Sequence, residues 1–158
     1  MKKQTTCLTQ GAMTAALYVV LTMLSHAFGL DSGAVQLRFS EALCILPMFS
    51  PAAIMGLFVG CILSNLLAGG IVWDVIFGSL ATLIGAVGTY KLRHMPPAAI
   101  AAPIIANTVI VPFVLAYGYG LTGGIPYFML TVGAGELISC GVFGSVLYIT
   151  LKKYKKFF

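Results

Sequence analysis

Long apolar stretches with few charged interruptions dominate the chain. Charge-free runs cover residues 4–30, 42–73, 75–90, 95–135 and 137–151. A helix needs about 20 largely apolar residues to cross the hydrocarbon core of a bilayer. The pattern therefore predicts several membrane-spanning helices, and two of the runs are too long for a single crossing.

Turn signals divide the two longest runs. The sequence "FSP" places Pro51 at a position where a helix can begin, and "YGYGLTGGIP" interrupts the later run with glycines and Pro126. The predicted helices are residues 8–28, 39–49, 51–68, 73–91, 97–117 and 125–153. We therefore expect residues 1–158 to form one six-helix membrane domain.

Composition and charge agree with this pattern. Hydrophobic residues make up 59% of the chain, charged residues 8%, and the mean hydropathy is +1.01, which excludes a water-soluble domain. The net charge of +5 is concentrated in three basic clusters. These are Lys2 and Lys3, Lys91 and Arg93, and Lys152, Lys153, Lys155 and Lys156. The apolar segments predict an all-α bundle in the cell membrane. The basic clusters predict cytoplasmic termini and contacts with lipid rather than nucleic acid.

The second predicted helix is too short to cross alone, since 11 residues at 1.5 Å each span only about 16 Å. Just before it, Gln36 and Arg38 alternate with apolar neighbours such as Leu37, at the period of an extended chain. Non-helical backbone at membrane depth lines a cavity or is buried in protein. We therefore expect residues 29–40 to cover an outward-facing pocket. The alternative is an ordinary outer loop in which Arg38 reaches the lipid headgroups.

Polar residues within the apolar runs are candidates for the pocket wall, because a charge at the bilayer centre costs about 2.5–3.5 kcal/mol. Glu136 lies near mid-membrane in its predicted helix, whereas Asp74, Asn65 and Asn107 lie in the outer half. Each can instead hold helices together through hydrogen bonds. The predicted binding residues are Gln36, Arg38, Glu41, Asn65, Trp73, Asp74, Asn107 and Glu136.

Trp73 offers an aromatic surface beside Asp74, although an interfacial anchor is the plainer interpretation of an aromatic residue there. The four cysteines have no metal-binding spacing, so we expect no metal site. The sequence also lacks GxxxxGK[ST], HExxH and GxSxG. We expect neither an enzyme nor a cofactor.

Ala12 and Ala16 are small residues four positions apart in the first predicted helix. This spacing lets membrane helices approach closely. It serves either packing within the bundle or docking of a partner subunit. The spacing alone does not separate the two uses.

Extended strings, namely "VQLRFSEALCILP", "MGLFVGCILSNLL" and "WDVIFGSLATLIGA", with "GELI" as weaker support, closely resemble the queuosine-precursor transporter (QueT) family. This family belongs to the substrate-binding S components of energy-coupling factor (ECF) transporters. The resemblance implies a six-helix chain that works with a transmembrane coupling subunit and two cytoplasmic ATPases. The family's AxxxA docking motif matches Ala12 and Ala16.

The ligands that the resemblance implies are small planar bases: 7-deazaguanines with a cyano or aminomethyl substituent, or queuine. A guanine-like edge presents N–H donors that suit a carboxylate, and a cationic arm requires a second carboxylate. Glu136, with Asp74 or Glu41, fits these needs. The alternatives are an S component for a different vitamin and a non-transport membrane assembly subunit, in which Arg38, Glu41 and Glu136 are structural pairs.

Overall fold

The described residues fold into six helical rods. The structure, a computed structural model, describes residues 2–30 and 36–154; residues 1, 31–35 and 155–158, which include Val35 and two lysines of the last basic cluster, lie outside the described residues. The elements are α1 (Lys2–Ala27), η1 (Phe39–Met48), α2 (Ala52–Leu67), α3 (Val72–Lys91), α4 (Pro96–Phe113), η2 (Val114–Gly118), α5 (Ile125–Glu136), η3 (Leu137–Phe143) and α6 (Gly144–Tyr154).

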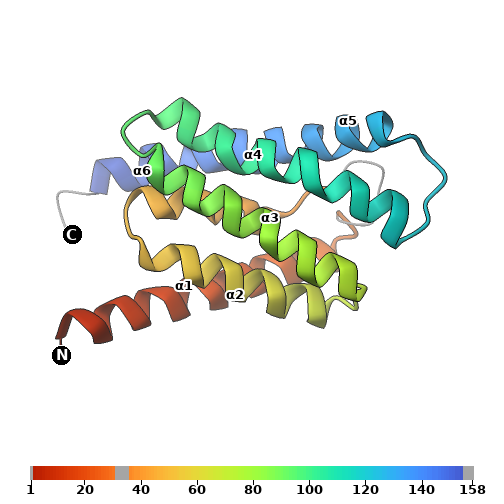
Figure 1. Cartoon of the computed structure of the whole chain (residues 1–158). Helices are drawn as coiled ribbons and strands as arrows, with labels where there is room; N and C mark the ends of the chain where they lie inside the picture. The colour runs from red at the N-terminus through yellow and green to blue at the C-terminus, as the bar shows by residue number, and fades with distance from the viewer. Residues whose placement is uncertain (1, 31–35, 155–158) are drawn as a thin grey trace.

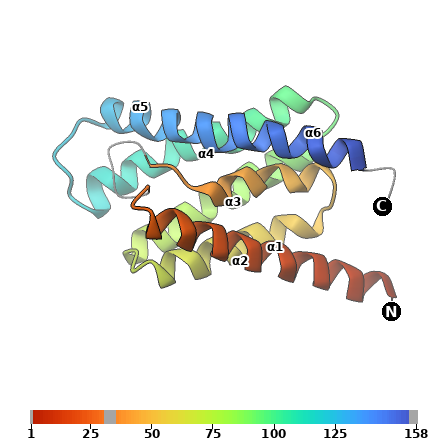
Figure 2. The same cartoon turned by 180° about the vertical axis from the view of Figure 1, so that it is seen from behind.

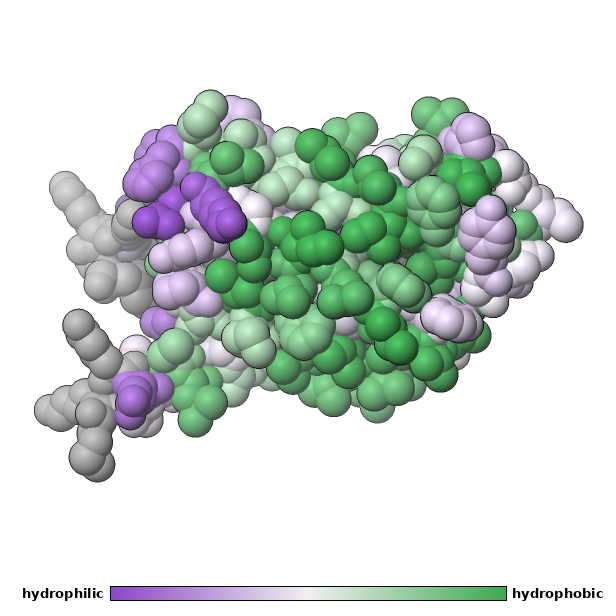
Figure 3. All heavy atoms as spheres, in the orientation of Figure 1, coloured by the Kyte–Doolittle hydropathy of each residue, from purple (hydrophilic) through white to green (hydrophobic). Residues whose placement is uncertain are grey.

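The rods lie side by side in a bundle, with the start of α1 and the end of α6 at the same end of the molecule (Figures 1 and 2). The turn between α3 and α4 lies at this end too, whereas the connections from α2 to α3 and from η2 to α5 lie at the opposite end. An apolar band runs between two more polar ends on the face shown in Figure 3. This arrangement confirms the all-α, multi-pass membrane bundle; its orientation in the membrane stays a prediction.

Within residues 2–30 and 36–154, four helical stretches are long and apolar enough to cross a bilayer, namely Gln4–Ala27, Val72–Lys91, Pro96–Gly118 and Ile125–Tyr154. The last is one continuous helix with a π-helical segment, η3, in its middle. The sequence predicted helices at these positions, although α1 begins about two turns earlier than expected. The shorter rods, η1 and α2, complete the set of six.

The second rod differs from the expected α-helix because η1 is a 3-10 helix of 10 residues. A 3-10 helix rises about 2.0 Å per residue, so η1 extends about 20 Å instead of about 16 Å. Such helices rarely exceed four residues, and tertiary packing accounts for the length here. Leu43 and Cys44 of η1 are buried in the core with Tyr18, Leu57 and other residues.

Close packing of α1 on α2 depends on two glycines. A Cβ atom at Gly56 would lie 2.5 Å from the Gly11 carbonyl oxygen, and one at Gly60 would lie 2.8 Å from Tyr18 Cβ. The α1 residues nearest to these glycines are Gly11, Thr14, Ala15 and Tyr18, so this close approach does not involve Ala12 or Ala16. Ala12 and Ala16 are both exposed, which favours the partner-docking interpretation over packing within the chain.

Candidate functional site

A small polar cavity lies in the interior of the bundle. It is lined by Gln36, Arg38, Glu41, Asp74, Gly78, Thr82, Asn107, Val111, Val132 and Glu136, and its volume is about 20 Å³. Six of the eight predicted binding residues thus come together from five separate segments of the chain. The cavity also gathers three of the chain's four acidic residues. Acidic residues, which are scarce in this sequence, are therefore concentrated at one place.

Two carboxyl groups in the lining of this cavity share one amide donor. Asn107 Nδ2 donates to Glu136 Oε1 at 3.0 Å and also lies 3.5 Å from Glu41 Oε2. The amide therefore bridges the two side chains from α4. Glu41 is only 3% exposed, and its other oxygen, Oε1, accepts a hydrogen bond from the Tyr18 hydroxyl at 2.5 Å.

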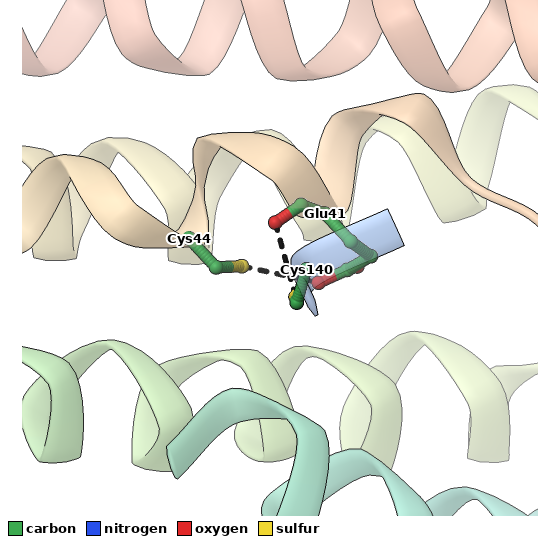
Figure 4. A group of neighbouring side chains, drawn as sticks. All are labelled: Glu41, Cys44 and Cys140. Atoms are coloured by element: carbon green, nitrogen blue, oxygen red, sulfur yellow. Dashed lines mark hydrogen bonds between the residues drawn. The ribbon is translucent and has the colours of Figure 1, made fainter. Parts of the chain in front are cut away.

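Thiols supply further donors to the same carboxyl groups. Cys44 Sγ donates to Glu41 Oε2 at 3.0 Å, and Cys140 Sγ lies 3.4 Å from Glu136 Oε2 and 3.2 Å from the Glu41 carbonyl oxygen. Figure 4 shows Glu41, Cys44 and Cys140 converging from η1 and the last helix. Their donor atoms lie within 4.8 Å of one another. A thiophilic cation would fit this geometry, but hydrogen bonding to the carboxyl groups already accounts for both thiols.

A wider vestibule of about 310 Å³ adjoins the polar cavity and shares Gln36, Arg38 and Asp74 with it. Arg38 Nη1 donates to Asn65 Oδ1 at 3.4 Å, and Asn65 Nδ2 in turn donates to the Asp74 carbonyl oxygen. Asn65 therefore belongs to the vestibule, where it holds Arg38. The vestibule lies at the end of the bundle that carries the α2 to α3 connection.

Tyr119 forms part of the vestibule wall. Its hydroxyl donates to Asp74 Oδ2 at 3.1 Å. Burial, followed by the charge of Asp74, raises the pKa of Tyr119. The hydroxyl therefore remains a donor at neutral pH, and the phenol ring presents an aromatic surface to the vestibule.

The structure corrects the position expected for Trp73. Its side chain is 58% exposed and stacks on Phe77, with 5.9 Å between ring centroids. Together they line an apolar surface groove, separate from the polar cavity. Consecutive helical residues point about 100° apart, so when the Asp74 carboxyl turns inward the Trp73 ring turns outward. Trp73 therefore offers no stacking surface beside the polar cavity.

Comparison with known protein families matches residues 8–153 to the family described as QueT transporter. The chain belongs to the QueT transporter family. A curated relative, the "Queuosine precursor transporter QueT" of Lactococcus lactis subsp. cremoris (strain MG1363), is 40% identical over 74 residues, which cover 46% of this chain and 43% of the relative. The chain thus matches less than half the length of that relative. No solved structure matches the chain.

In this QueT-family protein, the segment before η1, residues 36–38, packs directly on α5. Arg38 has extended backbone angles (φ −118°, ψ 112°), as the alternating pattern predicted. Gly135 faces the Gln36 backbone so closely that a Cβ atom would lie 2.1 Å from the Gln36 carbonyl oxygen. Residues 36–38 therefore form a wall of the polar cavity, held against α5 beside Glu136.

Sequence reasoning missed three polar contributors to this QueT-family site, namely Tyr18, Thr82 and Tyr119. Thr82 lines the cavity and donates to the Gly78 carbonyl oxygen at 3.1 Å. A signal for Tyr18 was present: Tyr18, Thr22 and Ser25 form a polar stripe at helical spacing in an apolar segment. For Tyr119, which lies near the end of a predicted helix, an interfacial anchor was the plainer interpretation.

Proposed function

We propose that this chain is the substrate-binding S component of an ECF-type importer and captures a 7-deazaguanine base with a cationic aminomethyl arm. Membership of the QueT transporter family supports transport of a queuosine precursor. The charges at the site support the choice of a ligand with a cationic arm. Three carboxyl groups and one guanidinium line the polar cavity, so a cationic ligand group improves the charge balance.

The pair of carboxyl groups bridged by Asn107 is the observation that carries this proposal. The polar cavity, at about 20 Å³, holds about one water molecule, and an ammonium group is of similar size. An ammonium placed there replaces water and donates to Glu41 and Glu136. Hydrogen bonds between charged partners are roughly twice as strong as neutral ones.

The planar base itself is too large for the polar cavity and fits the vestibule instead, whose volume is about 310 Å³. There the Asp74 carboxylate can accept the paired N–H donors of a guanine-like edge. Arg38 can donate to a ring carbonyl oxygen. Tyr119, rather than Trp73, then provides the aromatic surface on which the base stacks.

Transport requires partners that supply energy, and the proposed ones are a membrane coupling subunit and two cytoplasmic ATPases. The vestibule then faces the outside, and the end with both termini faces the cytoplasm. Ala12 is exposed and lines an apolar groove with Met55 and Val59 of α2. Ala16 is exposed one turn further along α1. This surface is the proposed docking face for the coupling subunit.

A binding screen on the purified chain tests the ligand assignment. The ligands are 7-aminomethyl-7-deazaguanine, its cyano analogue, queuine, thiamine and riboflavin, measured by calorimetry. We expect the aminomethyl base to bind more tightly than the cyano base, and neither vitamin to bind. Binding of a vitamin alone would favour the S component of a different transporter. Absence of binding to every compound would favour the assembly-subunit alternative.

Ala16→Trp is expected to abolish association with the coupling subunit and uptake, while the isolated chain keeps its ligand affinity within about twofold. A bulky ring prevents the close helix approach that small residues allow. Co-purification with the coupling subunit and calorimetry measure the two effects. Val146→Trp is the matched control, because Val146 is an exposed residue of a different helix, α6, and does not line this groove. Normal assembly of Ala16→Trp would exclude this face as the docking surface.

A further inference from the structure

Three hydrogen bonds join one face of α1 to the start of η1. The Tyr18 hydroxyl donates to Glu41 Oε1, Thr22 Oγ1 donates to Ser40 Oγ at 2.8 Å, and the Phe39 backbone N–H donates to Ser25 Oγ at 2.9 Å. Spacings of four and three residues place the three donors and acceptors of α1 on the same helix face. Their partners are three consecutive residues, 39–41.

These contacts are isolated from solvent and from lipid. Tyr18 and Ser25 are 0% exposed and Thr22 is 1% exposed. The N-terminus of η1 has no side-chain cap from Arg38, and the first N–H groups of a helix need partners outside it. Ser25 supplies one of them, so α1 fixes the position at which η1 begins.

The same contacts determine which way the Glu41 carboxyl group faces. Tyr18 occupies Oε1 on the side of α1, and Oε2 faces Cys44 and Asn107. A glutamate side chain on a short helix samples several rotamers unless a partner selects one. Tyr18 is the contact that anchors Oε1 and so leaves Oε2 toward the polar cavity.

We propose that Tyr18 is a positioning residue for ligand binding: it holds Glu41 so that Oε2 receives the ligand's cationic arm, and Thr22 with Ser25 holds the segment that carries Glu41. This inference rests on the proposed function, and it adds α1 to the elements that set specificity. Tyr18 itself does not line the cavity or the vestibule. It acts through Glu41.

A positioning role and a merely structural role make different predictions for ligand selectivity. If Tyr18 orients Glu41 toward the arm, its hydroxyl matters only for ligands that carry the arm. If Tyr18 only stabilises the bundle, its removal weakens all ligands equally. The ratio of affinities for 7-aminomethyl-7-deazaguanine and unsubstituted 7-deazaguanine, which share the ring, separates the two roles.

Calorimetry on purified Tyr18→Phe measures this ratio. We expect about tenfold weaker binding of the aminomethyl base, the scale of a hydrogen bond to a charged group, and less than about twofold loss for 7-deazaguanine. Tyr148→Phe is the matched control, because the Tyr148 ring packs on Phe49 away from the cavity. It should leave both affinities unchanged.

Equal losses for the two ligands, or no loss for either, would overturn the inference while the proposed function stands. A wild-type chain that binds neither base overturns the proposed function and the inference with it. Thr22→Val provides a second test in case Tyr18→Phe does not fold. It removes the Thr22–Ser40 contact, and we expect about threefold weaker binding of the aminomethyl base alone; equal losses for both ligands would again overturn the inference.

Discussion

Glu136→Gln is expected to weaken binding of 7-aminomethyl-7-deazaguanine by at least about tenfold, or about 1.5 kcal/mol, the lower range for a hydrogen bond to a charged group. The substitution keeps the size of the side chain and its contact with Asn107 Nδ2. It removes one of the two carboxyl groups that the cationic arm would meet. Calorimetry on the purified variant measures the change.

The control for this variant is Thr131→Val, on the same helix. The Thr131 hydroxyl donates to the Phe128 carbonyl oxygen at 3.2 Å, and Thr131 does not line the cavity. Its affinity should equal that of the wild type. An unchanged affinity for Glu136→Gln would assign Glu136 to interhelical hydrogen bonding, the plainer alternative for an intramembrane carboxyl group.

Arg38→Ala provides an internal comparison for Glu136→Gln. Arg38 contacts Asn65 at the vestibule, where water competes for its hydrogen bonds, so we expect a smaller loss than for Glu136→Gln. Wild-type affinity in both variants would contradict the proposed binding site. It would favour the alternative in which the segment before η1 is an ordinary outer loop. A larger loss for Arg38→Ala would move the main ligand contact from the polar cavity to the vestibule.

The sequence predicted most of the fold and most of the cavity lining for a common physical reason. Polar groups inside a bilayer must find partners within the protein. A few carboxyl and amide groups in long apolar runs were therefore expected to converge, and Glu41, Asn107 and Glu136 do. The short second rod and the extended residues before it were visible as a break in helical periodicity.

The features that sequence reasoning did not predict depend on side-chain direction and on contacts between distant segments. Trp73 and Asp74 are adjacent in sequence, yet they face opposite environments because a helix rotates about 100° per residue. Cys44 and Cys140 are 96 positions apart and meet only because η1 packs against η3. Spacing along the chain carries no information about that contact. The π-helical form of η3, next to Glu136, also had no signal in the hydrophobic pattern.

Gly135→Ala is expected to destabilise the bundle and to weaken ligand binding together. A Cβ atom at Gly135 would meet the Gln36 carbonyl oxygen at 2.1 Å and the Gln36 carbonyl carbon at 3.0 Å. These are backbone atoms, which cannot rotate away, so residues 36–38 must shift. Overpacking of this kind costs about 1–3 kcal/mol. Gln36 and Arg38 line the polar cavity, and their displacement should also lower affinity for the aminomethyl base by several fold.

Gly133→Ala is the matched control, two residues earlier in the same helix. There the nearest atoms to an added Cβ are the Thr108 side-chain Cγ2 and Oγ1, both at 3.4 Å, which is ordinary contact. Alanine favours a helix over glycine by about 1 kcal/mol, so Gly133→Ala should leave stability unchanged or raise it. Thermal unfolding in detergent, with and without ligand, measures both variants. Equal melting temperatures for the two would contradict the close approach of residues 36–38 to α5, whereas a loss confined to Gly135→Ala would locate the wall of the cavity at this contact.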